Sequence, residues 1–286
     1  GLAFTNRTEL IFSYTDWLQG TDINIVNFGL SQKLGESNVL GFSVQSMSFG
    51  DLNETTTSQP EGTGATFSPS LLNVNVSFAK AFSNSIYAGL TFKVISHSIP
   101  DASATGVGLD AGVIYVTGAK QNIRFGVVLK NIGPKMRYTG DGFSIKALFE
   151  SSDYAITVSQ RSESFELPTQ LRIGASYDLY FGDDISRLTF AGSFVSNSFT
   201  KDQFVFGLEF NLRDYLMLRG GYTYESNITE DIENTNRTNV YNGPSVGATV
   251  QIPFNKETKS GLSIDYSYQT TAHFKGTHVM GVKFAL

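Results

Sequence analysis

The sequence of 286 residues contains no cysteine, which excludes a disulfide framework and thiol chemistry. It also lacks a run of about 18 consecutive apolar residues, so no transmembrane helix is expected. Charged residues make up only 16% of the chain, below the roughly 25% of an ordinary soluble domain. The low charge content therefore needs an explanation other than membrane-spanning helices.

Catalytic signatures are absent as well. The three histidines, His97, His273 and His278, have no zinc-like spacing to another ligand, and no Gly-x-Ser-x-Gly elbow occurs. A phospholipase built on a barrel would need a Ser/His pair at the lipid boundary, where His273 and His278 would lie, but we interpret these two histidines as loop residues. We expect no enzymatic activity, no metal and no cofactor. The net charge of −5 argues against nucleic acid as a partner.

Aromatic residues are abundant, and apolar and polar side chains alternate with a period of two. The chain has 23 phenylalanines, 13 tyrosines and 28 glycines. Between residues 203 and 211, Phe204 and Phe206 alternate with Gly207 and Glu209. This period indicates strands with one apolar and one polar face, and helical periodicity does not recur. Fourteen strands are predicted, at residues 8–17, 22–33, 38–49, 70–80, 85–97, 106–117, 122–131, 168–178, 187–196, 203–211, 215–225, 243–252, 260–269 and 277–286.

The predicted connections alternate in length. The longest, residues 50–68, 132–167 and 226–242, all follow odd-numbered strands. Short turns on one rim and long loops on the other are typical of bacterial outer-membrane barrels. The sequence thus predicts one domain, residues 1–286, with an all-β fold: a 14-stranded antiparallel transmembrane β-barrel with short periplasmic turns, long extracellular loops and both termini periplasmic. The short turns follow even-numbered strands, near Gly35, Phe82, Ala119, Asp183, Arg213 and Lys256.

Aromatic residues gather near the predicted strand ends. Such placement is typical of the aromatic girdles of membrane barrels, whereas β-propensity alone would spread the rings along the strands. Near the long-loop rim they are Tyr14, Trp17 and Phe49; near the short-turn rim they are Phe82, Tyr87, Tyr180, Phe181, Tyr215 and Phe254.

The C-terminal stretch supports the same interpretation. Met280, Val282, Phe284 and Leu286 fall on one face of an extended strand. With Gly281 they resemble the C-terminal targeting signal of bacterial outer-membrane proteins, although Val279 stands where a polar residue is usual. The alternative is a sandwich domain that ends on a strand, but such a fold does not require long loops on one rim and short turns on the other. Because the chain starts close to a strand, we expect a signal peptide and a plug segment to precede it.

Charged residues fall on the weakly hydrophobic, inward face of the predicted strands. Their signs alternate between neighbouring strands, so they are expected to pair with one another and to stiffen the wall or fill the lumen. A polar conduit is the alternative. The predicted lumen charges are Lys93, Asp110, Arg124, Lys130, Arg172, Glu209, Arg219, Asp265 and Lys283.

The long-loop rim is the expected surface for protein partners, over residues 50–68, 135–149 and 226–242. Nine residues in these segments are the predicted contacts: Asn53, Glu54, Phe67, Met136, Arg137, Tyr138, Phe143, Asn227 and Tyr241.

Three stretches of the sequence resemble a known family. Residues 127–134 (VVLKNIGP) with the following Met136-Arg137-Tyr138, residues 167–174 (LPTQLRIG) and residues 13–18 (SYTDWL) are similar to the PorV/PorQ family of Bacteroidetes. Members of that family have the 14-stranded fold of FadL-type fatty-acid transporters. The resemblance implies a role in the type IX secretion system, in the bacterial outer membrane.

This role would define the partners. The expected ones are the large type IX translocon barrel and the C-terminal domains of secreted cargo, with outer-membrane lipid and lipopolysaccharide around the wall. The chain would hand cargo to surface attachment. The alternative is a FadL-like transporter of hydrophobic small molecules, which needs an apolar pocket inside the barrel and a lateral opening. The polar inner face predicted for the strands disfavours that alternative, and a scaffold without a partner is a third, weaker hypothesis.

Overall fold

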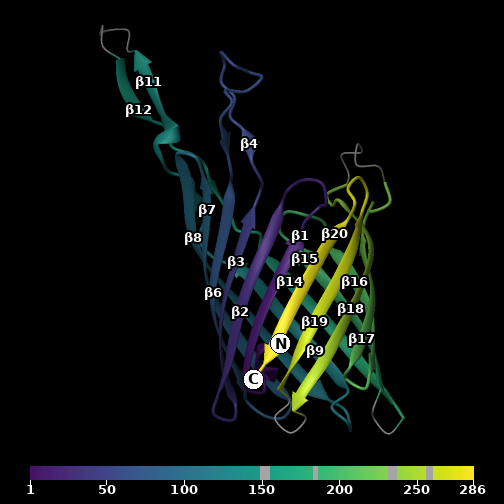
Figure 1. The fold of residues 1–286 in the computed structure, drawn as a ribbon. Helices are drawn as coiled ribbons and strands as arrows, with labels where there is room; N and C mark the ends of the chain where they lie inside the picture. The colour runs from purple at the N-terminus through teal and green to yellow at the C-terminus, as the bar shows by residue number, and fades with distance from the viewer. Residues whose placement is uncertain (149–154, 183–185, 231–236, 256–259) are drawn as a thin grey trace.

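The structure is a computed structural model that describes residues 1–148, 155–182, 186–230, 237–255 and 260–286. Fourteen strands form a closed antiparallel barrel, in which β1 pairs with β20 to complete the ring (Figure 1). The predicted 14-stranded barrel is confirmed. The strands are β1 (Thr8–Asp16), β2 (Asn24–Leu34), β3 (Asn38–Ser48), β6 (Ser70–Ala81), β7 (Ile86–Ile99), β8 (Ala102–Thr117), β9 (Ile123–Ile132), β14 (Gln170–Phe181), β15 (Ser186–Asn197), β16 (Gln203–Leu212), β17 (Leu216–Glu225), β18 (Tyr241–Asn255), β19 (Ser260–Thr271) and β20 (Thr277–Ala285).

The alternation of the sequence becomes the two faces of the wall. Cross-strand partners share a face, and Phe12 of β1 pairs with Phe28 of β2 and with Val282 of β20. Large apolar side chains such as Phe206 and Leu208 stay about half exposed on the outside. An apolar belt around a closed sheet matches the hydrocarbon of a bilayer and leaves no unpaired edge. Among the described residues, no helix has the length and apolar composition needed to cross a membrane.

The two ends of the barrel differ. Both termini lie toward the end that carries the tight turns, such as the one at Gly35 between β2 and β3 (Figure 1). The other end carries small sheets where long loops were predicted. They are the pairs β4 (Leu52–Asn53) with β5 (Thr66–Phe67), β10 (Met136–Arg137) with β13 (Ser164–Phe165), and β11 (Ser144–Leu148) with β12 (Ala155–Ser159). The predicted turn residues Asp183 and Lys256 and the loop residue Phe149 lie outside the described residues.

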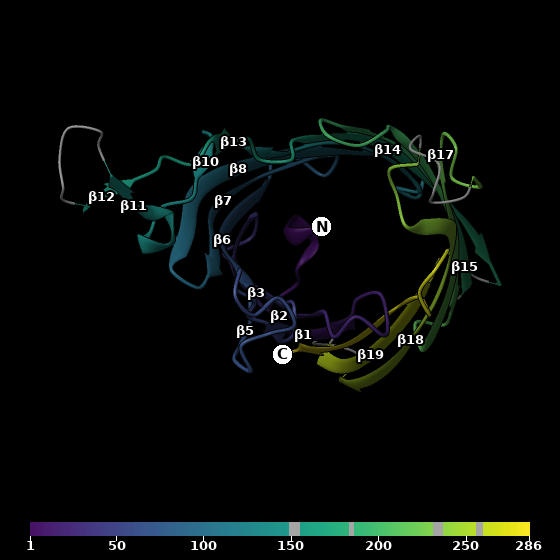
Figure 2. The same cartoon turned by 90° about the horizontal axis from the view of Figure 1, so that it is seen from above.

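The first residues of the chain lie inside the barrel. A short 3-10 helix, η1 (Leu2–Phe4), contacts β3, β6 and β7, and Figure 2 shows the N-terminus within the ring. The Phe4 ring lies 4.6 Å from the Tyr87 ring. Tyr87 therefore faces the lumen, and its assignment to the outer aromatic girdle is wrong. Tyr180 was misassigned in the same way, because it pairs with the lumen-facing Arg187.

Candidate functional site in the barrel lumen

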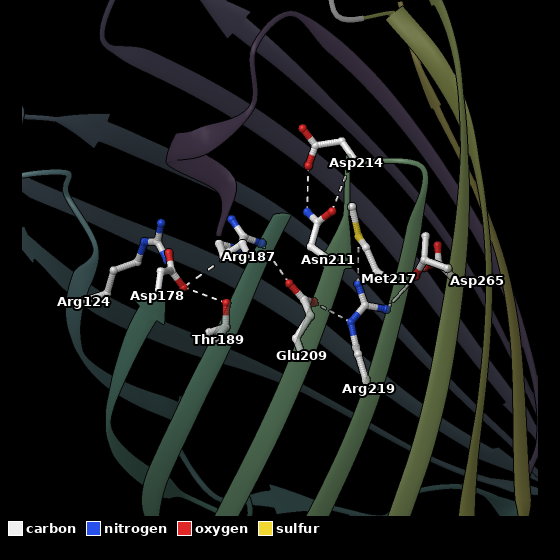
Figure 3. A network of polar contacts seen from close by, with 11 residues as sticks. Arg124, Asp178, Arg187, Thr189, Glu209, Asn211, Asp214, Met217, Arg219 and Asp265 are labelled. Carbon is white, nitrogen blue, oxygen red and sulfur yellow. Dashed lines mark hydrogen bonds and ion pairs between the residues drawn. The ribbon is translucent and has the colours of Figure 1, made fainter. Parts of the chain in front are cut away.

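One half of the lumen carries a continuous ladder of alternating charges (Figure 3). Asp178 of β14 has a fully buried side chain, which pairs with Arg124 of β9 at 2.7 Å and accepts a hydrogen bond from Thr189. Glu209 of β16 lies between Arg187, at 2.8 Å, and Arg219.

The ladder continues across β17 to β19. The Arg219 Nε lies 2.7 Å from Glu209, and its Nη1 lies 3.8 Å from Asp265. Arg219 also donates to the hydroxyl of Thr249, which donates to Asp265. Each carboxylate thus bridges neighbouring strands, so the ladder cross-links the wall from β9 to β19.

Some of the ion pairs expected between neighbouring strands form, and others are replaced by different pairs. Lys93 pairs with Asp110 at 2.7 Å, as the alternating signs indicated. Arg124 pairs with Asp178 instead of Asp110, and Asp265 pairs with Arg219 instead of Lys283. Asp178 and Arg187 were missed by the sequence analysis. Asp178 lies on the same inward face as Arg172, Gly174 and Ser176. The two-residue period was therefore sufficient to place Asp178 in the lumen.

The other half of the lumen is shaped by an irregularity in the sheet. Between β8 and β9 the register shifts, because Lys130 and Asn131 together face the single residue Asp110. Asn131 has a positive φ of 58°, and its backbone N–H donates to the Asp110 carboxylate at 2.8 Å. The Lys93 ammonium donates to the Asn131 side chain. Both oxygens of Asp110 are therefore occupied, one by Lys93 and one by Asn131.

A cavity of about 300 Å³ lies beside this bulge, toward η1. We call it the Leu2 cavity. Glycines at positions 89 and 112 leave room for it on the inner face of β7 and β8. This part of the inner face is thus less polar than the sequence analysis expected. The side chains on its wall include those of Leu2, Ala79, Tyr87, Thr91, Asp110, Ile114, Val128 and Lys130.

Positive charge is in excess at the polar end of the Leu2 cavity. The charged groups that act on Lys130 are Lys93, Arg172 and Asp110, so three cations surround one carboxylate that is already paired. Neither the Lys130 ammonium nor the Arg172 guanidinium has a hydrogen bond or an ion pair among the described residues. The predicted lumen charge Lys283 likewise has none in the described part of the chain.

The chain segment that follows β9 packs against the inner face of β8. Met136 is 1% exposed and packs with Leu167 and Ala104 on the inner face of β8. A Cβ on Gly106 would lie 2.5 Å from the Met136 side chain, and one on Gly108 would lie 3.5 Å from Leu167. The prediction of Met136 as a partner contact is therefore wrong, because its side chain is part of the packing that closes this side of the mouth.

Other predicted contact residues lie in this segment or beyond it. Tyr138 is half-buried, stacks on Phe165 at 5.4 Å and shares a hydrogen bond with the His97 ring. Arg137 is exposed, and Phe143 closes the short helix η2 (Asp141–Phe143). From there the β11–β12 hairpin projects away from the barrel (Figure 1), and we call residues 135–166 the arm.

The remaining predicted contacts have different environments. Asn53 and Glu54 are exposed on the β4–β5 hairpin, where Phe67 pairs with Leu52. The side chain of Asn227 accepts a hydrogen bond from Lys201. Tyr241 accepts a hydrogen bond from the indole of Trp17 at 2.6 Å and lies 3.2 Å from the Thr277 hydroxyl. Tyr241 therefore ties together the ends of β18, β1 and β20.

His278 lies on a strand, contrary to the prediction that it is a loop residue, whereas His97 lies on a strand as predicted. His97 is on β7, and His278 is on β20, where its ring nitrogen lies 2.8 Å from the Tyr266 hydroxyl. His273 lies between β19 and β20. The described part of the chain contains no group of three or more potential metal ligands.

Comparison with known proteins gives matches at the level of structure. No family model matches the sequence, and no curated protein matches it. The toluene transporter TodX of Pseudomonas putida aligns over 98% of this chain and 88% of its own, with a TM-score of 0.54 and 12% identity. The toluene transporter TbuX of Ralstonia pickettii gives the same score and identity over 97% and 88% of the two chains. A FadL homologue of Pseudomonas aeruginosa aligns over 97% of this chain and 90% of its own, with a TM-score of 0.54 and 12% identity.

These likenesses extend over nearly the whole chain, so they concern the complete barrel. At 12% identity they establish the fold alone. The chain has a FadL-like 14-stranded outer-membrane barrel fold.

Proposed function

We propose that this barrel binds hydrophobic small molecules in its lumen and passes them across the outer membrane. The Leu2 cavity carries this proposal, because it provides the apolar pocket that such a transporter needs. Its volume of about 300 Å³ lies at the lower end of the range of ligand sites, which are mostly apolar with a few polar groups. Leu2, Ile114 and Val128 provide the apolar wall, and Thr91 and Lys130 provide the polar groups.

The fold supports the same function. The solved structures similar to this chain include two toluene transporters and a FadL homologue. The charge ladder fits this function as well, since mutually paired charges stiffen one half of the wall and leave the other half for a ligand.

A binding experiment on the purified barrel in phosphatidylcholine nanodiscs tests this function. The probe is 1-octanol, followed by calorimetric titration. Val128→Trp fills the Leu2 cavity with an indole, and the matched control is Val205→Trp, since Val205 faces the lumen on β16 outside the cavity. We expect wild type and the control to bind the probe and Val128→Trp to lose binding. Equal binding by all three proteins would contradict the assignment of the site.

A second candidate function is that of a component of type IX secretion, binding the translocon or cargo C-terminal domains. Its support is that the resembling segments meet in space. The Asn131 side chain donates to the Pro168 carbonyl at 2.8 Å, and Leu167 packs against Met136 at the base of the arm. These segments therefore hold the arm at a fixed position on the mouth, where a protein partner has access to it.

Comparison of surface-attached proteins in strains with and without the gene tests this second function. Loss of proteins that carry type IX C-terminal domains from the surface is the expected result. An unchanged set of surface proteins excludes the secretion role for this chain.

A further inference from the structure

Two further cavities lie along β17–β20, on the side of the lumen that carries the charge ladder. One has a volume of about 510 Å³ and reaches Gln269 and Thr277, which pair where β19 ends and β20 begins. The other has a volume of about 490 Å³ and lies at the opposite end of the wall. It reaches Asp214, between β16 and β17, and Asn255, the last residue of β18. We call them the upper and the lower polar cavity, and together they extend from one end of these strands to the other.

A single row of inward-facing residues separates the two polar cavities. Along β18, Gly247 lines the upper cavity, Gln251 lines the lower one, and Thr249 is the inward residue between them. At β17, β19 and β20 one inward residue likewise lies between residues of the two cavities. The separating row consists of cross-strand neighbours, which are Met217, Thr249, Asp265 and Gly281.

The Arg219 side chain extends from the upper polar cavity over this row (Figure 3). Its Nη1 donates to the Thr249 hydroxyl at 2.6 Å and lies 3.8 Å from Asp265. Its Nη2 lies 3.5 Å from the Met217 sulfur. The side chains of Arg219 and Asp265 nevertheless stay 41% and 44% exposed. The separating row is therefore a level at which charged groups face open lumen, and it is not a packed apolar barrier.

The walls above and below the row suit water. Residues with small side chains or none line the upper polar cavity, among them Gly207, Gly221, Ser245 and Ser267. Amide, hydroxyl and charged groups line the lower one, among them Asn6, Gln251, Ser263 and Lys283. Polar groups at such a wall are stable when they are hydrated. A water molecule takes about 30 Å³ of the liquid, so each cavity has room for on the order of ten of them.

We infer that the lumen contains a second route, in which small hydrated ions pass between the upper and the lower polar cavity beside Arg219. The described residues that line the Leu2 cavity include none that line either polar cavity. The inference therefore goes beyond the proposed function, since it concerns other residues and another class of solute. An ion loses several kcal/mol when it is taken out of water, and a wall of hydroxyls, amides and paired charges lets it remain hydrated. One side of the lumen thus serves hydrophobic molecules and the other serves ions.

Conductance of the purified barrel in planar phosphatidylcholine bilayers tests this route. Ser267 is exposed on the wall of the upper polar cavity, so Ser267→Trp places an indole in the route. Wild type is expected to conduct KCl, and Ser267→Trp is expected to lower the conductance severalfold. The matched control is Ser43→Trp. Ser43 faces the lumen on β3, where Asn75 donates to it, and it lines neither polar cavity. This control is expected to retain the wild-type conductance.

The charge of Arg219 provides a readout that does not depend on blocking the lumen. Arg219→Gln removes one positive charge beside the separating row and is expected to shift the reversal potential in a KCl gradient toward that of K⁺. Above about 0.1 M KCl the Debye length is below about 10 Å, so only charges close to the route have this effect. Arg172→Gln makes the same change on the inner face of β14, outside both polar cavities, and is expected to leave the reversal potential unchanged.

Three results would overturn the inference. They are a wild type that does not conduct KCl, equal conductance of Ser267→Trp and Ser43→Trp, and equal reversal potentials of Arg219→Gln and wild type. None of them bears on the proposed function, which the binding of 1-octanol at the Leu2 cavity decides separately.

Discussion

Gly106 of β8 and Met136 of β10 compete for one space, because a Cβ on Gly106 would lie 2.5 Å from the Met136 Cγ. Gly106→Val is therefore expected to displace Met136 and loosen the arm, at a cost of about 1–3 kcal/mol for overpacking. Limited proteolysis in nanodiscs measures this effect as faster cleavage between residues 133 and 166. Gly220→Val is the control, since no atom lies within 4 Å of a Cβ there, and it is expected to leave the cleavage rate unchanged. Equal cleavage rates in both variants would argue against the packing described for Met136 and Gly106.

Asp178 is expected to contribute more to stability than any other member of the charge ladder. Its side chain is fully buried and pairs with Arg124, so Asp178→Asn leaves Arg124 and Arg187 without their shared carboxylate. The expected loss is about 3–5 kcal/mol, the range for breaking a buried pair. Asp265 is 44% exposed and lies 3.8 Å from Arg219, so Asp265→Asn is expected to cost below about 1 kcal/mol. Urea unfolding measures both values, and equal losses would refute this ranking.

Tyr241 is expected to stabilise the rim of the barrel by joining the ends of β18, β1 and β20. Trp17 is the chain's one tryptophan and donates to the Tyr241 hydroxyl, so its fluorescence reports this contact. Tyr241→Phe removes the acceptor and is expected to shift the emission maximum and cost about 1 kcal/mol. Tyr224→Phe, on the outer face of β17, is the control and should leave the spectrum unchanged. An unchanged spectrum in Tyr241→Phe would show that the hydrogen bond does not form in solution.

The assignment of the two faces of the wall is tested by a pair of arginine substitutions on β16. Leu208 is 50% exposed on the outer face, and Leu208→Arg is expected to destabilise the barrel by about 2–4 kcal/mol if it lies near the bilayer midplane. Val205 faces the lumen on the same strand, where an arginine is hydrated, so Val205→Arg should have little effect. Equilibrium unfolding from phosphatidylcholine vesicles measures the difference. A larger effect at Val205 would reverse the assignment of the faces.

The sequence predicted the wall of this protein far better than its mouth. Where one face of the wall contacts lipid and the other contacts water, apolar and polar side chains must alternate along each strand. All fourteen strands were found from this two-residue period. Beyond the membrane both faces of a strand meet water, so alternation is no longer required. This is why the small pair β10–β13 and the β11–β12 hairpin were predicted as loop, and why Met136 was assigned to the surface.

The sequence predicted which charged residues face the lumen, but only some of the ion pairs that they form. Inward positions follow from the alternation, so Lys93, Glu209 and Arg219 were placed correctly. Which charges pair depends on the register between strands, which a single sequence does not contain. The bulge at Asn131 depends on one residue with positive φ, and neither it nor the position of Leu2 inside the ring leaves a periodic signal.

Uptake of radiolabelled 1-octanol by cells is the most direct test of transport through this lumen. A strain without the gene is compared with strains that carry wild type, Val128→Trp or Val205→Trp, at equal levels of folded barrel. We expect rapid uptake with wild type and Val205→Trp, and slow uptake with Val128→Trp and without the gene. Uptake that is equally fast in all four strains would contradict the claim that this lumen carries hydrophobic molecules.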